Sequence, residues 1–347
     1  MNKSNRIKLG IMLAGVLGLI GESAKADIFG SGANAFTIDF VNIGNPGNAD
    51  DAGAGGGSYS SPYGGVSYTY RMGTYEISQA QIEKATASGL ANVTAGAWSG
   101  NQPAANMTWF EMAAFVNWMN TSTGHQAAYN LSQIPPDFAG NTWSLTLWSS
   151  AQAWQLGGEN LYRNKDAYYF LPSGDEWYKS AYHKNDGVTA NYWDYATGSN
   201  DVPTPVTNGT TSGTAVFYDG VTALAAPADV NNDGGLSSYG TMGQDGNIWE
   251  WTESDSTAPN DNPVDFRDAR GGNYAYNDVP LQSSFRGYND PRSGDIIGLG
   301  FRVASIVPEP TTAVSLLLGL GVLALRRNRN HVGCCALGHE AAKQPCR

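Results

Sequence analysis

The run DGNIWEWTES, residues 245–254, places a carboxylate between two tryptophans shortly after a glycine. Carboxylate and carbonyl oxygens are the hard ligands that Ca²⁺ prefers, so Glu250 is a candidate calcium ligand. The same side chain could instead cap a backbone or pair with an arginine such as Arg270 or Arg302. Trp249 and Trp251 are typical of a packed strand. The run therefore predicts either a calcium-binding loop or the polar centre of a core.

A second acidic run, DVNNDGG at residues 229–235, has part of the spacing of an EF-hand calcium loop. The residues at its first, third, fifth and sixth positions fit that loop: Asp229, Asn231, Asp233 and Gly234. Position 12 is Gly240 instead of the required glutamate, and no helix is evident on either side. A calcium site and an Asx-rich turn both remain open here.

The sequence offers little for other kinds of catalysis. Residues 27–310 contain two histidines, His125 and His183, and no H-E-x-x-H, G-x-S-x-G or P-loop motif. His183 is placed to end a helix, where a histidine suits the helix dipole. All three cysteines follow residue 330, so residues 27–310 contain no disulfide, thiolate metal site or cysteine nucleophile.

Three helices are marked by capping residues. Ser78 is an N-cap, and Thr108 with Glu111 and Ser173 with Glu176 have capping-box spacing. Their aromatic residues are typical of a core. Alternation predicts a strand at residues 36–44 and a strand or hairpin at residues 66–78. Shorter strand candidates are AYYFLP, GNIWEWTE, DARGGNYA and GLGFRVASI.

Few regular elements and long loops are the main features of this pattern. Residues 186–240 show little periodicity and are rich in Gly, Thr, Asn and Asp, and the chain has 43 glycines. Loops of such length are functional or held in place by other contacts, for instance by ions. We therefore expect one α+β domain over residues 36–305, preceded by a short mature N-terminal segment, residues 27–35.

Both ends of the chain look like processing segments. Residues 1–26 have a basic start, an apolar stretch and the sequence Ala24-Lys25-Ala26, which is typical of a cleaved signal peptide. A second apolar stretch, residues 311–325, precedes Arg326, Arg327 and Arg329, which the positive-inside rule places in the cytoplasm. This predicts a short, transient transmembrane anchor with a cytoplasmic tail at residues 331–347.

Removing both ends leaves a strongly acidic domain. Residues 27–310 contain 11 Lys and Arg against 29 Asp and Glu, so their net charge is near −18, compared with −11 for the whole chain. A domain with this charge is a poor match for nucleic acid, which requires a basic surface. We expect no nucleic-acid partner, and contact with a membrane through the anchor alone.

Six motifs in order give the domain a resemblance to a known family. These are RMGTYEISQAQ, PAANMTWFEMAAFVNWMN, YFLPSGDEWYKSAY, YGTMGQDGNIWEW, RGGNY and IGLGFRVAS. Together they resemble the formylglycine-generating enzymes, also called sulfatase-modifying factors, over about residues 36–305. The resemblance implies a C-type-lectin-like α+β fold with little regular secondary structure, usually stabilised by calcium.

The resemblance also implies how the family's enzyme works and where this chain departs from it. That enzyme oxidises a substrate cysteine with copper held by two cysteines. At the matching positions this chain has Gln282 and Gly287, and Val303 follows the G-F-R motif. An amide and a glycine cannot bind Cu(I), which needs soft thiolates. We therefore expect neither copper nor formylglycine-generating activity.

Calcium is the cofactor that the resemblance favours. One family site, carried over onto this chain, consists of the carbonyl groups of Asp245, Gly246 and Ile248 and the side chain of Glu250. A second family site is less complete here. Val216 stands where an asparagine contributes, although Asp219 could still supply an oxygen.

The C-terminal segment, residues 307–330, resembles the PEP-CTERM sorting signal. It has the motif VPEP, an apolar stretch and the sequence RRNR. In bacteria that make exopolysaccharide, an exosortase is believed to cut such an anchor and to release the protein outside or attach it there. The resemblance implies export across the inner membrane and a final location at the cell surface or in the extracellular matrix.

Taken together, the sequence predicts an exported, surface-sorted, non-catalytic protein. Its expected role is binding or structure in the cell envelope or exopolysaccharide matrix, with exopolysaccharide or another glycan as partner. An enzyme of unknown specificity on the same fold is the alternative. A hollow lined by clustered polar groups near residues 282–292 favours the enzyme, whereas a flat or filled surface there favours binding or structure.

Overall fold

The computed structural model describes residues 25–53, 63–94, 96–137, 140–221, 223–257, 259–294 and 298–307. Residues 1–24 of the predicted signal peptide (1–26), the predicted anchor at 311–325 and the tail at 331–347 lie outside the described residues. Lys25 and Ala26, the last two residues of the predicted signal peptide, belong to a strand. Among the residues that are described, none forms a helix long and apolar enough to cross a membrane.

A five-stranded sheet joins distant parts of the chain in the order β1-β2-β3-β15-β8. Its strands are β1 (Lys25–Phe29), β2 (Phe36–Ile43), β3 (Tyr70–Gly73), β8 (Tyr169–Phe170) and β15 (Ala304–Ile306). Burial alternates along β2, as predicted for residues 36–44. Strand β1 pairs antiparallel with residues 36–40 of β2, so part of the N-terminal segment 27–35 belongs to the sheet. The domain ends at Ser305.

A second sheet has the order β13-β12-β11-β14. It consists of β11 (Trp249–Asp255), β12 (Arg267–Arg270), β13 (Gly287–Asn289) and β14 (Leu299–Gly300). In the register of β11 and β12, Glu250 lies opposite Arg270. This sheet therefore brings the run DGNIWEWTES close to the segment that contains Gln282 and Gly287, although Gln282 lies 32 positions after Glu250 in sequence.

The described residues also form three capped α-helices. They are α1 (Gln79–Ala87), α2 (Trp109–Ser122) and α3 (Gly174–Tyr182). The caps Ser78, Thr108 and Ser173 each form a complete capping box, which confirms the three predicted helix starts. Helix α2 contacts β8, and α3 contacts β11. Helix α2 is buried over most of its length, which agrees with the core role predicted for its aromatic residues.

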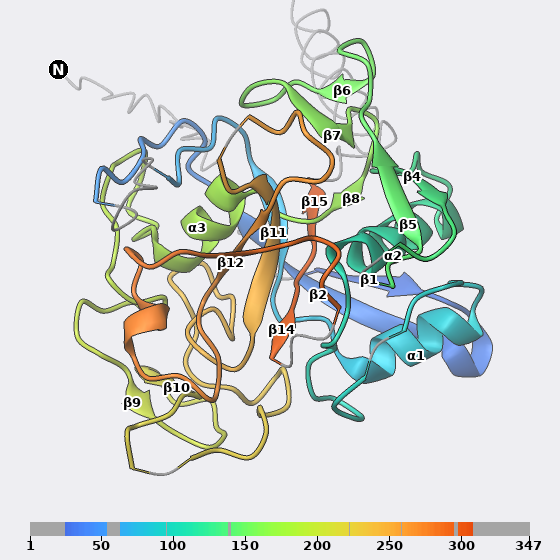
Figure 1. Cartoon of the computed structure of the whole chain (residues 1–347). Coiled ribbons are helices and arrows are strands. Elements are labelled where there is room, and N and C mark those ends of the chain that lie inside the picture. The colour runs from blue at the N-terminus through green and yellow to red at the C-terminus, as the bar shows by residue number, and fades with distance from the viewer. Residues whose placement is uncertain are drawn as a thin grey trace, which may run out of the picture. The chain divides into compact units, whose positions relative to one another are not determined.

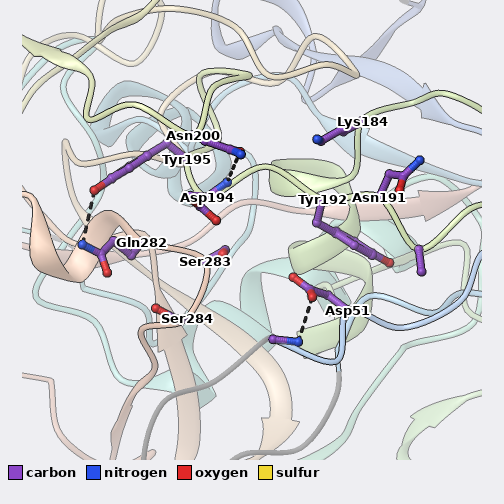
Figure 2. A pocket seen from close by; sticks show the side chains of 12 residues that line it. Asp51, Lys184, Asn191, Tyr192, Asp194, Tyr195, Asn200, Gln282, Ser283 and Ser284 are labelled. Carbon is purple, nitrogen blue, oxygen red and sulfur yellow. Dashed lines mark hydrogen bonds between the residues drawn. The ribbon is translucent and has the colours of Figure 1, made fainter.

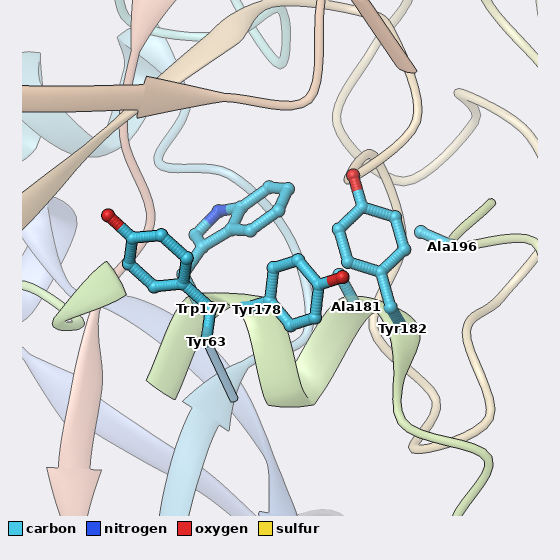
Figure 3. Close-up of a cluster of buried hydrophobic side chains, with 6 residues drawn as sticks. All are labelled: Tyr63, Trp177, Tyr178, Ala181, Tyr182 and Ala196. Atoms are coloured by element: carbon cyan, nitrogen blue, oxygen red, sulfur yellow. The ribbon is translucent and has the colours of Figure 1, made fainter. Parts of the chain in front are cut away.

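An aromatic cluster lies along one side of α3 (Figure 3). The rings of Tyr178 and Tyr182 are 4.8 Å apart between centroids, and Tyr63 stacks on Tyr178 at 6.1 Å. The cluster confirms that the aromatic residues of this helix are core residues. Two of its hydroxyl groups also reach the surface loops, because Tyr178 donates to Asp51 and Tyr182 to the carbonyl of Leu281. Helix α3 thereby fixes the loops that surround the hollow described below.

The rest of the chain is mostly loops. Figure 1 shows long coil between α3 and β11, interrupted by β9 (Thr204–Pro205) and β10 (Thr214–Ala215). Short elements elsewhere are η1 (Gly32–Asn34), β4 (Asn130–Gln133), β5 (Trp143–Thr146), β6 (Ala153–Trp154), β7 (Asn160–Asn164) and η2 (Val279–Leu281). The α+β prediction with few elements is confirmed. The strand expected over residues 66–78 is confirmed at β3 alone.

Candidate functional site

Glu250 is held by Arg302. Arg302 Nε lies 2.6 Å from Glu250 Oε2, and Nη2 lies 2.5 Å from Oε1. Trp177 Nε1 donates to Oε2 at 2.8 Å, so both carboxylate oxygens accept hydrogen bonds. All three side chains are buried. The arginine pair left open by the sequence is therefore present in the structure, and calcium at Glu250 stays a prediction.

The residues before Glu250 form a tight buried turn. Gly246 has φ = +97°, and a Cβ at this position would meet the carbonyl of Val216. The carboxylate of Asp245 is buried, and its Oδ2 accepts the backbone N–H of Thr197 at 2.9 Å. Burial raises the pKa of Asp245 to about 7. Ile248 packs in the core, where its side chain is fully buried.

Asn247 connects this turn to two further acids. Its Nδ2 donates to Glu76 Oε2 at 2.7 Å and to Asp233 Oδ2 at 3.1 Å, while its Oδ1 accepts the N–H of Ala228. Burial raises the pKa of Glu76 well above its usual range and that of Asp233 to about 7. The sequence analysis did not identify Glu76, because this residue lies 157 positions before Asp233 and no local pattern connects the two.

The EF-hand-like run does not converge on one point. Asp229 and Asn231 are exposed, and Asn231 Oδ1 accepts from Asn101 at 2.8 Å. Asp233 points inward and is 1% exposed. Asp219 is exposed and accepts the N–H of Val221. Within the described residues, no group of three or more His, Cys, Asp or Glu side chains is arranged to hold a metal. Calcium at these positions stays a prediction.

Both histidines lie against tyrosine rings, and His183 Nε2 also lies 3.4 Å from the hydroxyl of Thr189. His183 is buried at the end of α3, where its Nδ1 lies 2.9 Å from the hydroxyl of Tyr239. Burial lowers the pKa of His183, and the charge of Lys179 acts in the same direction. His125 stacks on Tyr168, with 4.4 Å between ring centroids. These contacts are those of structural residues.

A polar hollow of ≈ 490 Å³ lies beside the aromatic cluster of α3. Figure 2 shows Gln282 on one wall, donating to the hydroxyl of Tyr195 at 3.2 Å, and Asp51 on another. The other labelled side chains around it are Lys184, Asn191, Tyr192, Asp194, Asn200, Ser283 and Ser284. Charged and amide groups surround this space, but its lining contains neither histidine nor cysteine.

An aromatic groove of ≈ 650 Å³ is lined by residues from all four strands of the second sheet and from the segment 273–286. Trp249 is one of the lining residues, with its ring centroid 6.2 Å from Tyr276 and 5.8 Å from Phe285. Tyr276 is 54% exposed and Tyr288 is 40% exposed, and Phe266 stacks on Tyr288 at 5.7 Å. The groove also contains amides, from Asn273, Asn277 and Asn289.

The two positions that match the family's copper cysteines line two different hollows. Gln282 lines the polar hollow, and Gly287, in β13, lines the aromatic groove. Neither residue supplies a sulfur ligand. By the criterion drawn from the sequence, the polar hollow at Gln282 favours the enzyme alternative, and the expectation that a flat or filled surface would accompany a binding role is not met.

Comparisons with solved structures show where this fold occurs. Variable protein 1 of Treponema denticola aligns with a TM-score of 0.52 at 18% identity, covering 82% of this chain and 100% of that chain. CarF aligns with a TM-score of 0.51 at 16% identity, covering 78% of this chain and 99% of that chain. PvdO from Pseudomonas aeruginosa aligns with a TM-score of 0.48 at 14% identity, covering 82% of this chain and 100% of that chain. At these identities the likeness to the first two structures concerns the fold alone.

The family comparison covers most of the domain. No curated protein matches the chain. Residues 61–307, which include all three helices and the segment between the two hollows, match the sulfatase-modifying factor enzyme 1-like domain. The chain therefore belongs to the sulfatase-modifying factor enzyme 1-like family.

Proposed function

We propose that this chain is an exported, surface-sorted, non-catalytic member of its family that binds a glycan through the aromatic groove. The observation that carries the proposal is the exposure of Tyr276 and Tyr288 in one groove around Trp249. Apolar patches on a soluble protein mark binding sites, and an aromatic ring offers its face to the C–H groups of a sugar.

The polar groups of the groove suit the same ligand. Asn277 is exposed, and Asn289 is half-buried beside Tyr288. Amides donate and accept hydrogen bonds, as sugar hydroxyls require. Because residues 27–310 are strongly acidic, we expect a neutral or cation-bridged polysaccharide to bind better than an acidic one at low salt.

Export and sorting rest on the sequence at the two ends. The signal-peptide features of residues 1–26 and the PEP-CTERM-like segment 307–330 support passage through the inner membrane, then processing by an exosortase. The protein would then reside at the cell surface or in the exopolysaccharide matrix, where a polysaccharide ligand is abundant.

A screen of the purified protein against envelope and extracellular polysaccharides tests the binding proposal. We expect binding that weakens when Tyr276 or Tyr288 is replaced by alanine. Tyr75→Ala is the matched control, because Tyr75 is partly exposed and lies outside the groove lining. Equal binding by the wild-type protein and all three variants would contradict a role for the groove.

An enzyme of unknown specificity is the second candidate, and the polar hollow is the observation that favours it. Asp51, Asp194 and Lys184 provide ionisable groups around a space of ≈ 490 Å³. Such an enzyme would turn over the bound polysaccharide, so new reducing ends or released acyl groups in the same screen would identify it. Loss of that turnover in Asp194→Asn would assign it to the hollow.

A further inference from the structure

A small cavity lies between two buried carboxylates that have no basic partner of their own. Asp233 and Asp245 both line it, and they are 1% and 4% exposed. The remaining lining residues are also buried: Ala196, Thr197, Thr214, Gly235, Ser237, Thr241, Gly243 and Gln244. The cavity has a volume of ≈ 10 Å³, which is enough for one particle of the size of a water molecule.

Three oxygens at this cavity have no hydrogen-bond partner within the described residues. They are Asp233 Oδ1, Asp245 Oδ1 and the hydroxyl of Thr197, which is 8% exposed. Buried polar atoms are nearly always satisfied, and an unsatisfied charged oxygen is costly. Three such oxygens around one small space therefore indicate an occupant that interacts favourably with all of them.

The charges around the cavity favour a cation. Arg302 is the base nearest to Asp233, but its guanidinium already binds both oxygens of Glu250. Glu76 adds a further buried acid beside Asp233. Buried charges without compensation are unstable, and two carboxylates are balanced by one divalent ion.

We propose that Asp233 and Asp245 bind one Ca²⁺ ion in this cavity, with the Thr197 hydroxyl as a neutral ligand. All the side-chain ligands are hard oxygens, which Ca²⁺ prefers, and its flexible coordination suits an irregular cage. Zn²⁺ and Cu⁺ are poor matches, because the lining holds neither nitrogen nor sulfur ligands from His or Cys.

This site differs from the calcium site implied by the family resemblance. That site uses Glu250, which here pairs with Arg302, and the backbone carbonyl of Asp245. The proposed site uses the side chains of Asp233 and Asp245 instead. It joins residues from the two acidic runs that the sequence presents as separate candidates. It does not depend on glycan binding, since the cavity lies apart from the lining of the aromatic groove.

Metal content and thermal melting of the purified protein test the site. We expect about one equivalent of calcium per chain after dialysis against metal-free buffer. A ligand that binds the native state alone stabilises it, so excess chelator should lower the Tm by about 5–10 °C if calcium had been present at about 100 times its Kd. Added Ca²⁺ should restore the Tm.

Three variants distinguish this site from a calcium site built on Glu250. Asp233→Asn and Asp245→Asn should each lose the bound calcium and the chelator effect. Asp229→Asn, on the exposed part of the same loop, should keep both. Asp245→Asn preserves the backbone carbonyl, so a site made of carbonyls and Glu250 would survive that substitution.

The wild-type chelator experiment remains decisive if a variant fails to fold. A wild-type protein without stoichiometric calcium and with an unchanged Tm in chelator overturns the proposal. So does an Asp245→Asn variant that retains its calcium. If the two carboxyls hold protons instead, both asparagine variants melt at or above the wild-type temperature, which also overturns it.

Discussion

Arg302 and Glu250 form a fully buried, two-contact ion pair between β11 and the segment that joins β14 to β15. The guanidinium also donates to three backbone carbonyls, those of Gly73, Thr74 and Met242. One arginine thus ties the turn before α1, the loop before β11 and the second sheet together. The carboxylate that the sequence marked as a candidate metal ligand is the ion-pair partner of Arg302 in this fold.

Breaking this pair should be strongly destabilising. Arg302→Met leaves Glu250 buried without a counter-charge, so we expect a loss of about 3–5 kcal/mol in the free energy of unfolding, measured by urea denaturation. The double variant Arg302→Met, Glu250→Met should lose less than the single variant, because no unpaired charge remains. A double variant that is less stable than the single one would show that the pair is not the source of the effect.

The capping box of α2 predicts a smaller and more local effect. Thr108 Oγ1 accepts the N–H of Glu111 at 3.1 Å, so Thr108→Ala should cost about 1 kcal/mol of unfolding free energy. Thr121→Ala, on the exposed side of the same helix, should change stability by no more than about 0.5 kcal/mol. Denaturation curves of both variants measure the difference, and equal losses would argue against the cap.

Asp175 predicts a pH dependence with a definite sign. Burial raises its pKa to about 6, against an unfolded value near 4. The folded state therefore binds the proton of Asp175 more tightly than the unfolded state does. The resulting stabilisation is complete below about pH 4 and is lost as the pH rises through 6. Relative to Asp175→Asn, the wild-type protein should lose at most about 3 kcal/mol between pH 4 and 7. A difference that stays constant over this range would contradict the assignment.

The sequence could predict those parts of the fold that depend on residues close together in the chain. Thr108 with Glu111 and Ser173 with Glu176 mark helix starts because both partners lie within one turn. The alternation in β2 is equally local. The hairpin of β4 and β5 was not predicted, since Asn130–Gln133 is half-exposed and largely polar. The strand expected at residues 66–78 is limited to Tyr70–Gly73 because its neighbours enter loops.

The sequence identified only some of the site residues, missing Glu76, Tyr276 and Tyr288, and it did not identify their arrangement. Asp233 and Asp245 were recognised as oxygen ligands, yet their meeting at one cavity depends on how two loops pack. Whether Glu250 would pair with Arg302 or Arg270 depended on the orientation of side chains in the second sheet. The aromatic groove joins Trp249 with Tyr276 and Tyr288, which come from three segments.

The sorting proposal predicts the C-terminus of the mature protein. Processing at the PEP-CTERM-like segment should remove Arg326 and Arg327, so peptides that contain them should be absent from the extracellular and cell-surface fractions. Mass spectrometry of those fractions measures this directly. An intact C-terminal peptide in the exported protein would count against exosortase cleavage. Peptides that begin at Asp27 would confirm the predicted signal cleavage.

Titration of the purified protein with polysaccharide from an exopolysaccharide matrix tests the central claim most directly. Isothermal calorimetry should show saturable binding by the wild-type protein and by Tyr75→Ala. Binding should weaken at least about tenfold in the double variant Tyr276→Ala, Tyr288→Ala, because two exposed rings of the groove are lost. Unchanged affinity in that folded double variant, or no saturable binding by the wild-type protein to any polysaccharide of the panel, would contradict a glycan-binding groove.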